Sequence, residues 1–286
     1  MKKRLLVLCS LGAATVACAA VAVSTIPAMG ETSAAAGPPS ITVPTNAAGP
    51  AATDAKAVPV LVELFTSEGC SSCPPADVVL ANLERKQPVA GARIVPLGHH
   101  VDYWDRLGWT DPFSSARASD RQRSYSPLGS GSYTPQAVID GRSETIGSRR
   151  AMVENFVAEA AKRPHAAIAI TVAPRIDPAS PFEVTLKVGA LPPGASSDSE
   201  AIVALTQNVA RVVVPKGENA GSTLEHTAIA RELVVAGAIP AAGGASKATL
   251  KAPPGIDTKE LRIVAFVQER GSRRIHGTMT RDLDTK

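Results

Sequence analysis

Two cysteines three positions apart, Cys70 and Cys73, place the strongest constraint on this chain. The only other two, Cys9 and Cys18, fall in an N-terminal segment that has the features of an export leader. In the rest of the chain each cysteine can therefore form an intramolecular disulfide only with the other. Cross-linking so short a loop constrains the unfolded chain little, because the stabilisation by a disulfide grows with the length of the loop that it closes. The pair is better suited to redox chemistry or to binding a metal than to stabilising the fold.

The N-terminus predicts export. Lys2-Lys3-Arg4 precedes an uncharged run from Leu5 to Val23 and then small residues, which is typical of a bacterial signal peptide, here assigned to residues 1–30. The alternatives are an uncleaved anchor, since the run is long enough to span a membrane, or a lipid attached at Cys18. In each case the folded part lies outside the cytoplasm, where disulfides persist. We expect a periplasmic or secreted protein that meets a membrane only through this leader.

Composition excludes several function classes. Hydrophobic residues make up 44% of the chain, which rules out global disorder. The formal net charge of +4 falls to +1 without the three basic residues of the leader, so no nucleic-acid partner is expected. The chain has no Gly-x-Ser-x-Gly, His-Glu-x-x-His or glycine-rich phosphate motif, so a hydrolase has little basis.

The hydrophobic pattern changes twice along the chain. Residues 31–57 are rich in Ala, Gly, Pro, Ser and Thr without periodicity, which predicts a flexible linker. From 58 to 163, buried-strand patterns alternate with helical ones, whereas after Pro164 apolar residues alternate with polar or small ones, as in antiparallel strands. The expected strands are 58–65, 93–98, 137–139, 168–172, 182–188, 261–267 and 275–279, and the expected helices are 74–85 and 148–162. The sequence thus predicts an α/β domain over 58–163, with a long insert at 99–132, and an antiparallel β-sandwich-like domain over 164–286.

The cysteine pair lies between a predicted strand and a predicted helix. This order brings Cys70 to the helix N-terminus, where free backbone N–H groups and the helix dipole favour the reactive thiolate. Cys73, a few residues further on, is positioned to attack a mixed disulfide formed at Cys70. We therefore predict that Cys70 is the accessible attacking thiol and that Cys73 is the shielded, resolving thiol.

A Thr134-Pro135 dipeptide directly before a strand resembles the cis-proline segment of the thioredoxin superfamily. The resemblance implies that Pro135 is cis and packs beside the cysteine pair, with backbone groups of Thr134 pairing with an extended substrate. The alternative is an ordinary trans proline that opens a strand.

Three longer stretches carry a closer resemblance: 62–77 around the cysteines, 100–113 (His-Val-Asp-Tyr-Trp-Asp-Arg-Leu-Gly-Trp-Thr-Asp-Pro-Phe) and 217–226 (Gly-Glu-Asn-Ala-Gly-Ser-Thr-Leu-Glu-His). They are similar to a bacterial family of exported thioredoxin-like proteins catalogued as domain of unknown function twelve-twenty-three. The resemblance extends from about Val58 to the C-terminus. It implies an α/β thioredoxin-like domain followed by the β domain, and it brings no established reaction.

Two acidic residues near the pair bear on its reactivity. In thioredoxin a buried carboxylate on the strand before the cysteines assists proton transfer to the second one, and the resemblance makes Glu63 a candidate for that role. The spacing is one residue longer here, so a carboxylate that points to solvent is the alternative. Glu68 lies two residues before Cys70, and its charge would oppose the thiolate. We therefore expect a pair that is less strongly oxidising than the most acidic members of the thioredoxin superfamily.

Aromatic residues concentrate in and beside the insert. Six of the ten lie between Tyr103 and Tyr133, including both tryptophans, Trp104 and Trp109. Aromatic side chains of this kind suit the recognition of a polypeptide or small ligand, so Trp104, Trp109 and Tyr133 join Thr134 as candidate substrate contacts. The alternative is a small satellite core that packs the insert onto the sheet.

The leading hypothesis is an exported thiol–disulfide oxidoreductase in which Cys70, Cys73 and Pro135 form the reactive centre. It needs no cofactor and no resident metal, and its partners are exported proteins with thiols or disulfides and an unidentified electron donor. One alternative is a copper-binding protein or metallochaperone, since thiolates suit Cu(I) and a histidine such as His100 could join them. Another is a non-catalytic binding module with a permanent disulfide.

Overall fold

The computed structural model describes residues 41–42, 57–175, 177 and 180–284, all within the unit Pro38–Lys286. The predicted signal peptide lies outside the described residues, as does most of the predicted linker. The part of that linker that is described includes β1 (Ile41–Thr42), which pairs with β8.

A parallel strand pair forms the centre of the fold. β2 (Val58–Thr66) and β3 (Ala92–His100) pair over their whole length, and the crossover that parallel pairing requires contains α1 (Pro74–Lys86). The helix starts with two prolines, whose missing N–H groups cost nothing there, and ends where Gln87 adopts a left-handed conformation. This unit delivers the cysteine pair to the end of β2.

The other elements follow in chain order. The helices are α2 (Ala116–Arg123) and α3 (Arg150–Ala161), with 3₁₀ turns η1 (Asp102–Leu107), η2 (Ser126–Leu128) and η3 (Thr258–Glu260). The remaining strands are β4 (Gln136–Ile139), β5 (Ser143–Ile146), β6 (Ile168–Val172), β7 (Phe182–Val188), β8 (Ser199–Val213), β9 (Thr223–Ile239), β10 (Gly244–Leu250), β11 (Leu261–Glu269) and β12 (Ile275–Asp282).

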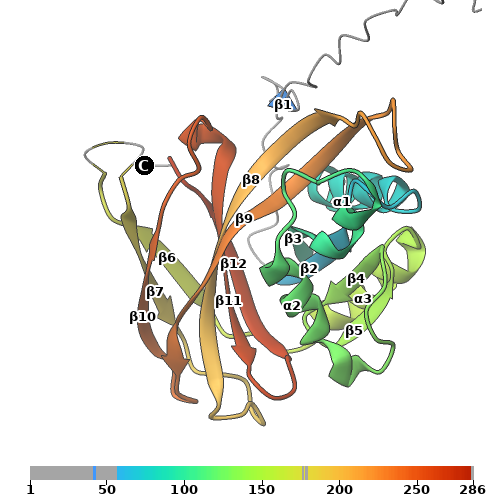
Figure 1. The fold of residues 1–286 in the computed structure, drawn as a ribbon. Coiled ribbons are helices and arrows are strands. Elements are labelled where there is room, and N and C mark those ends of the chain that lie inside the picture. Colours follow the sequence, from blue (N-terminus) through green and yellow to red (C-terminus); the bar gives the residue numbers. More distant parts are fainter. Residues whose placement is uncertain (1–40, 43–56, 176, 178–179, 285–286) are drawn as a thin grey trace, which may run out of the picture. The chain divides into compact units, whose positions relative to one another are not determined.

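The protein is a mixed α/β structure with one large and one small sheet (Figure 1). The large sheet has the order β12-β11-β8-β9-β3-β2-β4-β5, and the small one β10-β7-β6. The two domains that the sequence predicts on either side of residue 163 share the large sheet. β3 from the first pairs in parallel with β9 from the second, where Gly98 lies opposite Ile229. Gly98 favours this close contact, since a Cβ there would lie 3.0 Å from the backbone oxygen of Thr227.

The two faces of β2 support different elements. Val60, Val62 and Leu64 are buried beneath α1 and α3, whereas Leu61 and Phe65 point to the opposite face. That face carries the insert that contains η1 and α2. Alternation along a strand thus places helices on one side and the insert on the other.

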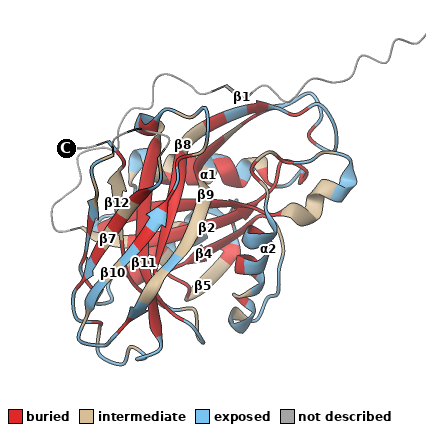
Figure 2. Cartoon of the chain, turned by 60° about the vertical axis from the view of Figure 1, so that its left-hand side comes forward, coloured by how far each residue is buried: buried red, intermediate tan, exposed pale blue. Residues whose placement is uncertain are grey.

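The small sheet packs on the other half of the large one. Apolar side chains of β6, β7 and β10 form a continuous buried cluster with those of β8 and β11. Figure 2 shows these strands of the large sheet coloured mostly as buried, while β10 and α2 present exposed residues.

The β4–β5 turn joins the two halves of the chain. Asp140 accepts a hydrogen bond from the Leu61 N–H through Oδ1, contacts His165 Nε2 through Oδ2, and accepts the Ile275 N–H through its carbonyl. Gly141 follows with φ +59°, and a Cβ on it would lie 1.9 Å from the Arg273 carbonyl oxygen. The turn and the β11–β12 connection are therefore in backbone contact.

Gly141→Ala should destabilise the protein by about 3 kcal/mol, because it adds left-handed strain and a backbone collision. Gly271→Ala, in the β11–β12 connection, is the matched control, since no atom lies within 4 Å of its added Cβ. Guanidinium unfolding of both variants measures the difference. Equal losses would mean that the two connections are not held against each other.

Candidate functional site

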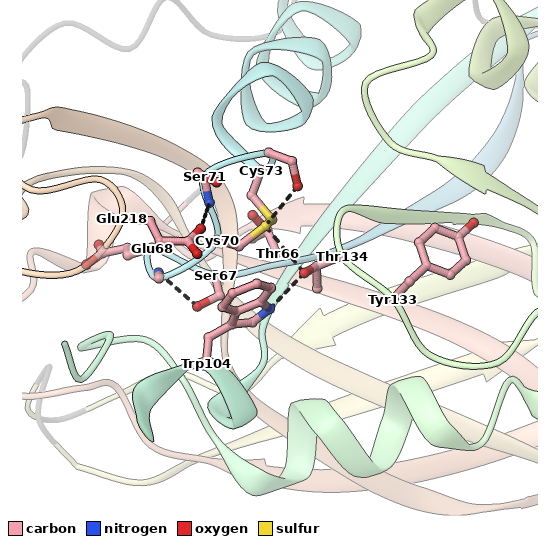
Figure 3. The surroundings of a disulfide bond; sticks show 12 residues. Thr66, Ser67, Glu68, Cys70, Ser71, Cys73, Trp104, Tyr133, Thr134 and Glu218 are labelled. Atoms are coloured by element: carbon pink, nitrogen blue, oxygen red, sulfur yellow. Dashed lines mark hydrogen bonds between the residues drawn. A yellow bond between two sulfur atoms is a disulfide. The ribbon is translucent and has the colours of Figure 1, made fainter. Parts of the chain in front are cut away.

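Cys70 and Cys73 form a disulfide at the N-terminus of α1 (Figure 3). Cys73 is the last residue before the helix, and its carbonyl accepts the N–H groups of Ala76 and Asp77. Both cysteines are fully buried, with 0% of their surface exposed, although Ser71 and Ser72 between them are exposed. In this disulfide form other segments pack over both cysteines, and the prediction that Cys70 is the accessible thiol of the reduced protein stays a prediction.

Thr134 and Trp104 form a chain of contacts to the first cysteine. The Thr134 hydroxyl donates to Cys70 Sγ at 3.4 Å, and Trp104 Nε1 donates to Thr134 Oγ1 at 2.8 Å. The Thr134-Pro135 peptide is cis, as predicted. Trp104 also packs against Gly69, since a Cβ added to Gly69 would lie 3.1 Å from the Cβ of Trp104. Two of the predicted substrate contacts thus lie at the disulfide.

The β8–β9 loop covers the cysteine motif from another side. Asn219 Nδ2 donates to the carbonyl oxygens of Glu68 and Cys70 at 2.7 and 3.1 Å, and Glu218 accepts the Ser71 N–H at 3.0 Å. Hydrogen bonds from Ser71 lower the pKa of Glu218. Sequence reasoning assigned no role to these residues, although they belong to one of the stretches that carried the family resemblance.

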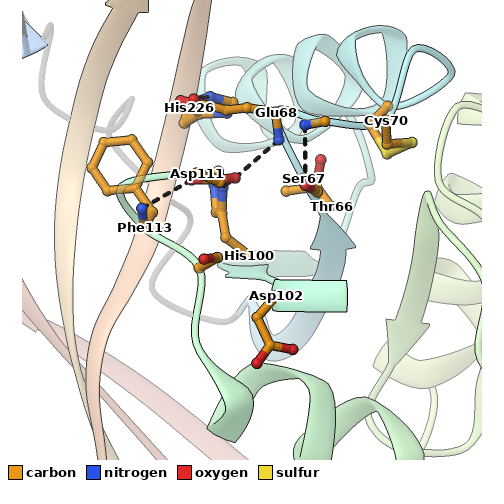
Figure 4. A network of polar contacts seen from close by, with 12 residues as sticks. Thr66, Ser67, Glu68, Cys70, His100, Asp102, Asp111, Phe113 and His226 are labelled. Atoms are coloured by element: carbon orange, nitrogen blue, oxygen red, sulfur yellow. Dashed lines mark hydrogen bonds and ion pairs between the residues drawn. A yellow bond between two sulfur atoms is a disulfide. The ribbon is translucent and has the colours of Figure 1, made fainter. Parts of the chain in front are cut away.

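A buried polar network lies beside the disulfide (Figure 4). The Glu68 N–H donates to Asp111 Oδ2 at 2.9 Å, and the same oxygen lies 2.6 Å from His100 Nδ1. The Glu68 carboxylate lies 3.2 Å from His226 Nε2 and accepts from Trp109 Nε1 at 2.7 Å. Trp109 therefore binds a carboxylate two residues from Cys70 rather than pointing to a substrate surface.

The network holds a positive charge on His226. Burial alone would lower the pKa of this histidine, but the carboxylates of Asp77 and Glu68 raise it to about 10. His226 Nδ1 lies 3.8 Å from Asp77 Oδ1, beyond hydrogen-bond distance. Burial would likewise raise the pKa of Asp111, which its contact with His100 lowers to about 2. Protonated His226 thus lies between two carboxylates beside the cysteines.

Glu63 is engaged away from the cysteines. It accepts hydrogen bonds from Arg121 and Tyr125, and Oε1 lies 2.9 Å from His99 Nε2. Burial alone would raise its pKa, but Arg121 and His99 lower it to about 2. Such a carboxylate is a poor acceptor for a thiol proton, because an ordinary thiol has a pKa of about 8.5. The predicted proton-transfer role is replaced by a structural one, since this face of β2 meets α2.

Tyr133 points away from the disulfide in Figure 3. Its hydroxyl donates to Glu144 Oε2 at 2.6 Å, and its carbonyl accepts from Gln122 Nε2. Burial, followed by the effect of Glu144, raises the pKa of the Tyr133 phenol. The structure therefore separates Tyr133 from Trp104 and Thr134, with which the sequence grouped it.

Within the described residues, no three side chains of His, Cys, Asp or Glu are arranged to hold a metal ion. None of the helices in the same part combines the length and apolar character needed to cross a bilayer.

Comparison with known proteins places the chain. Residues 61–268, most of the chain, match a family described as protein of unknown function (DUF1223). The chain belongs to the DUF1223 family. This confirms the resemblance seen in the sequence, and membership of DUF1223 by itself assigns no reaction.

Two solved structures resemble this DUF1223 member. A crystal structure of a protein from Agrobacterium tumefaciens is 27% identical, and the alignment covers 82% of this chain and 98% of that one with a TM-score of 0.62. HBP35 of Porphyromonas gingivalis is 14% identical over 82% of this chain and 77% of its own, with a TM-score of 0.55, so the likeness is one of fold alone. No curated protein matches the chain.

Trp104 should report the redox state of the cysteines. A disulfide quenches nearby indole emission, and Trp104 is linked to Cys70 through a single hydroxyl. We expect reduction to increase the tryptophan emission of the wild type and of Trp109→Phe, and to leave that of Trp104→Phe nearly unchanged. The double Cys70→Ser, Cys73→Ser variant is the control without a disulfide. A response retained in Trp104→Phe would contradict this assignment.

His226 should make stability depend on pH. Its pKa is about 10 in the folded protein and about 6.5 when unfolded, so its charged form stabilises the fold fully below pH 6.5. That contribution is lost as the pH rises from about 6.5 to about 10. We expect the unfolding free energy to fall more steeply over this interval for the wild type than for His226→Gln, as measured by urea unfolding at several pH values. Parallel slopes would show that His226 is not charged in the folded state.

Proposed function

We propose that this protein is an exported thiol–disulfide oxidoreductase with a thioredoxin-like unit over residues 58–163. The observation that carries the proposal is the contact of the Thr134 hydroxyl with Cys70 Sγ at the N-terminus of α1. It brings together the two motifs that the sequence singled out, which lie 64 residues apart.

The strand arrangement supports the thioredoxin-like unit. β3, β2, β4 and β5 are adjacent in that order, with β3 parallel to β2 and β4 antiparallel to it. α1 and α3 cover one face of these strands. A Cys-x-x-Cys pair next to a β-α-β unit is the context in which a redox role is expected. β8, β9, β11 and β12 extend the same sheet, and we propose that they support the site.

The proposed reaction is two successive exchanges. In the reduced protein, the Cys70 thiolate attacks one sulfur of a substrate disulfide, forms a mixed disulfide and releases the other substrate sulfur as a thiolate. The Cys73 thiolate then attacks Cys70 Sγ, which forms the Cys70–Cys73 disulfide and releases the second substrate thiolate. Two electrons pass from the cysteine pair to the substrate, and a dithiol protein returns them. Run in reverse, the same steps oxidise a substrate dithiol.

Several groups can stabilise a thiolate at Cys70. The Thr134 hydroxyl already donates to its sulfur, Ser72 Oγ lies 3.4 Å from it, and the N-terminus of α1 provides a favourable dipole. The Glu68 charge that was expected to oppose the thiolate is offset by protonated His226. The thiolate form of Cys70 is therefore less disfavoured than the sequence suggested.

Access to the sulfurs limits the proposed exchange. Both are buried beneath Trp104, Thr134 and the β8–β9 loop, so a substrate must displace part of this cover. The same burial favours a second candidate, a non-catalytic module whose disulfide stays closed. The predicted leader supports action on exported proteins in both cases.

Trapping separates the two candidates. Reduced Cys73→Ser should accumulate a mixed disulfide between Cys70 and a model substrate such as insulin, because no second thiol can release it. Cys70→Ser is the matched control, and intact-mass spectrometry measures the adduct. We expect an adduct on the first variant alone, and reduction of the wild-type disulfide by dithiothreitol without unfolding. Absence of an adduct on Cys73→Ser, with a wild-type disulfide reduced only after unfolding, would establish the closed module instead.

A further inference from the structure

A cavity of about 450 Å³ lies between α2 and the strands β8 and β9. The β11–β12 connection contributes Arg273 to the cavity lining. Among the described residues that contact the disulfide, none lines this cavity. Its size falls within the range of about 300–1,000 Å³ that is usual for small-molecule sites. The proposed exchange reaction makes no use of it.

Three arginines from three different elements line the cavity without an acidic partner. Arg117 comes from α2, Arg231 from β9 and Arg273 from the β11–β12 connection. Within the described residues, none of them lies within 4 Å of a carboxylate. The cavity therefore carries positive charge that the protein itself does not pair.

Arg231 is the most deeply placed of the three. Its Nη1 is buried and has no hydrogen-bond partner in the described part of the chain. Its guanidinium lies over the Phe113 ring at 5.0 Å, which fixes the group in the cavity wall. Burial lowers the pKa of Arg231 and the charge of Asp111 raises it, and the guanidinium stays protonated, as arginine does in proteins. A buried donor without an acceptor is unfavourable, and an anion would supply the missing acceptor.

The carboxylates around the cavity are already engaged. Asp120 pairs with Arg123, Glu200 with Arg270 at 2.8 Å, and Glu232 accepts the Lys251 N–H at 3.1 Å. A fourth arginine, Arg121, is in turn neutralised by Glu63. The Lys251 N–H carries no charge, so Glu232 stays an unpaired carboxylate of the cavity wall. The three unpaired arginines outnumber it, so the balance of charge favours an anion over a cation.

Part of the remaining wall is apolar. It is formed by side chains of the insert, β8 and β9: Phe113, Ala118, Ile202, Ala230, Leu233 and Val235. The polar side chains of His99, His100, Ser115 and Ser124 complete the lining. A ligand that fits must combine an apolar body with a negatively charged group.

We propose that the cavity binds a small organic anion, with an apolar body against β8 and β9 and a charged group held by Arg231. Arg117 and Arg273 supply further positive charge. An aromatic or aliphatic acid has this chemistry, whereas an inorganic anion lacks the body and a neutral hydrocarbon lacks the charge. The site is separate from the disulfide, so it holds whether or not Cys70 and Cys73 exchange.

The test uses the oxidised protein and 8-anilinonaphthalene-1-sulfonate, followed by fluorescence and calorimetry. We expect saturable binding of one probe per chain, weakened by about tenfold in Arg231→Gln, since charged hydrogen bonds contribute about 1.5–3 kcal/mol. Arg211→Gln is the matched control, because Arg211 lies on β8 but pairs with Glu225 and does not line the cavity. N-phenyl-1-naphthylamine, which has the same rings without the sulfonate, and sodium sulfate should each bind at least about tenfold more weakly.

A second variant keeps the proposal testable if Arg231→Gln does not fold. Arg117 is exposed, so Arg117→Gln should preserve the circular dichroism spectrum and weaken the probe by about threefold. Competition by decanoate should displace the probe from the wild type. Unchanged affinity in both arginine variants, equal affinity for the neutral probe, or absence of saturable binding would each overturn the proposal.

Discussion

The buried ion pair between Glu63 and Arg121 fixes the insert onto the sheet. Arg121 also donates to Gln268 on β11 and to the Tyr125 hydroxyl, so the pair joins β2, α2 and β11. Taking two charges out of water is costly, and the pair is tolerated because each remaining donor or acceptor finds a partner. Loss of one partner would leave an unpaired buried charge, at a cost of about 3–5 kcal/mol. The position of α2, and hence of the segments before and after it, depends on this interaction.

Those segments form the surroundings of the cysteines. Between β3 and α2 the chain contributes Trp104 and Asp111, and after α2 it reaches Thr134. β9 brings His226 to the same place because Gly98 allows it to approach β3 closely. The disulfide is thus surrounded by side chains from parts of the chain that share no local pattern. Their combined charge bears on its chemistry, with protonated His226 between the carboxylates of Glu68 and Asp77.

The insert also separates the two sites that we propose. One end of it packs over the disulfide through Trp104, and α2 forms a wall of the arginine-lined cavity. His100 belongs to both regions, since it contacts Asp111 in the network and lines the cavity. A single buried face therefore carries the cysteine pair on one side and the proposed ligand site on the other, without shared contacts at the sulfur atoms.

Local sequence determined the elements that carry the cysteines and some of the strands after them. The apolar run of β2, the two prolines that open α1 and the alternation in β7 and β11 are local signals, because each depends on the period of one element. They placed Cys70 and Cys73 at a helix N-terminus, and the likeness to thioredoxin predicted the cis bond at Pro135. The long strands β8 and β9 were not predicted, since both of their faces are partly buried and the alternation is lost.

Tertiary structure alone decided which groups meet. Glu63 pairs with Arg121, 58 residues away, and Glu68 with His226, 158 residues away, so no local pattern could show that one carboxylate is occupied and the other neutralised. The burial of Cys70 beneath Asn219 and Trp104 was hidden for the same reason. Sequence by itself determined that two cysteines lie close together at the start of a helix. The charge, cover and access of that pair follow from long-range packing, because electrostatics and burial depend on distance in space and not on separation along the chain.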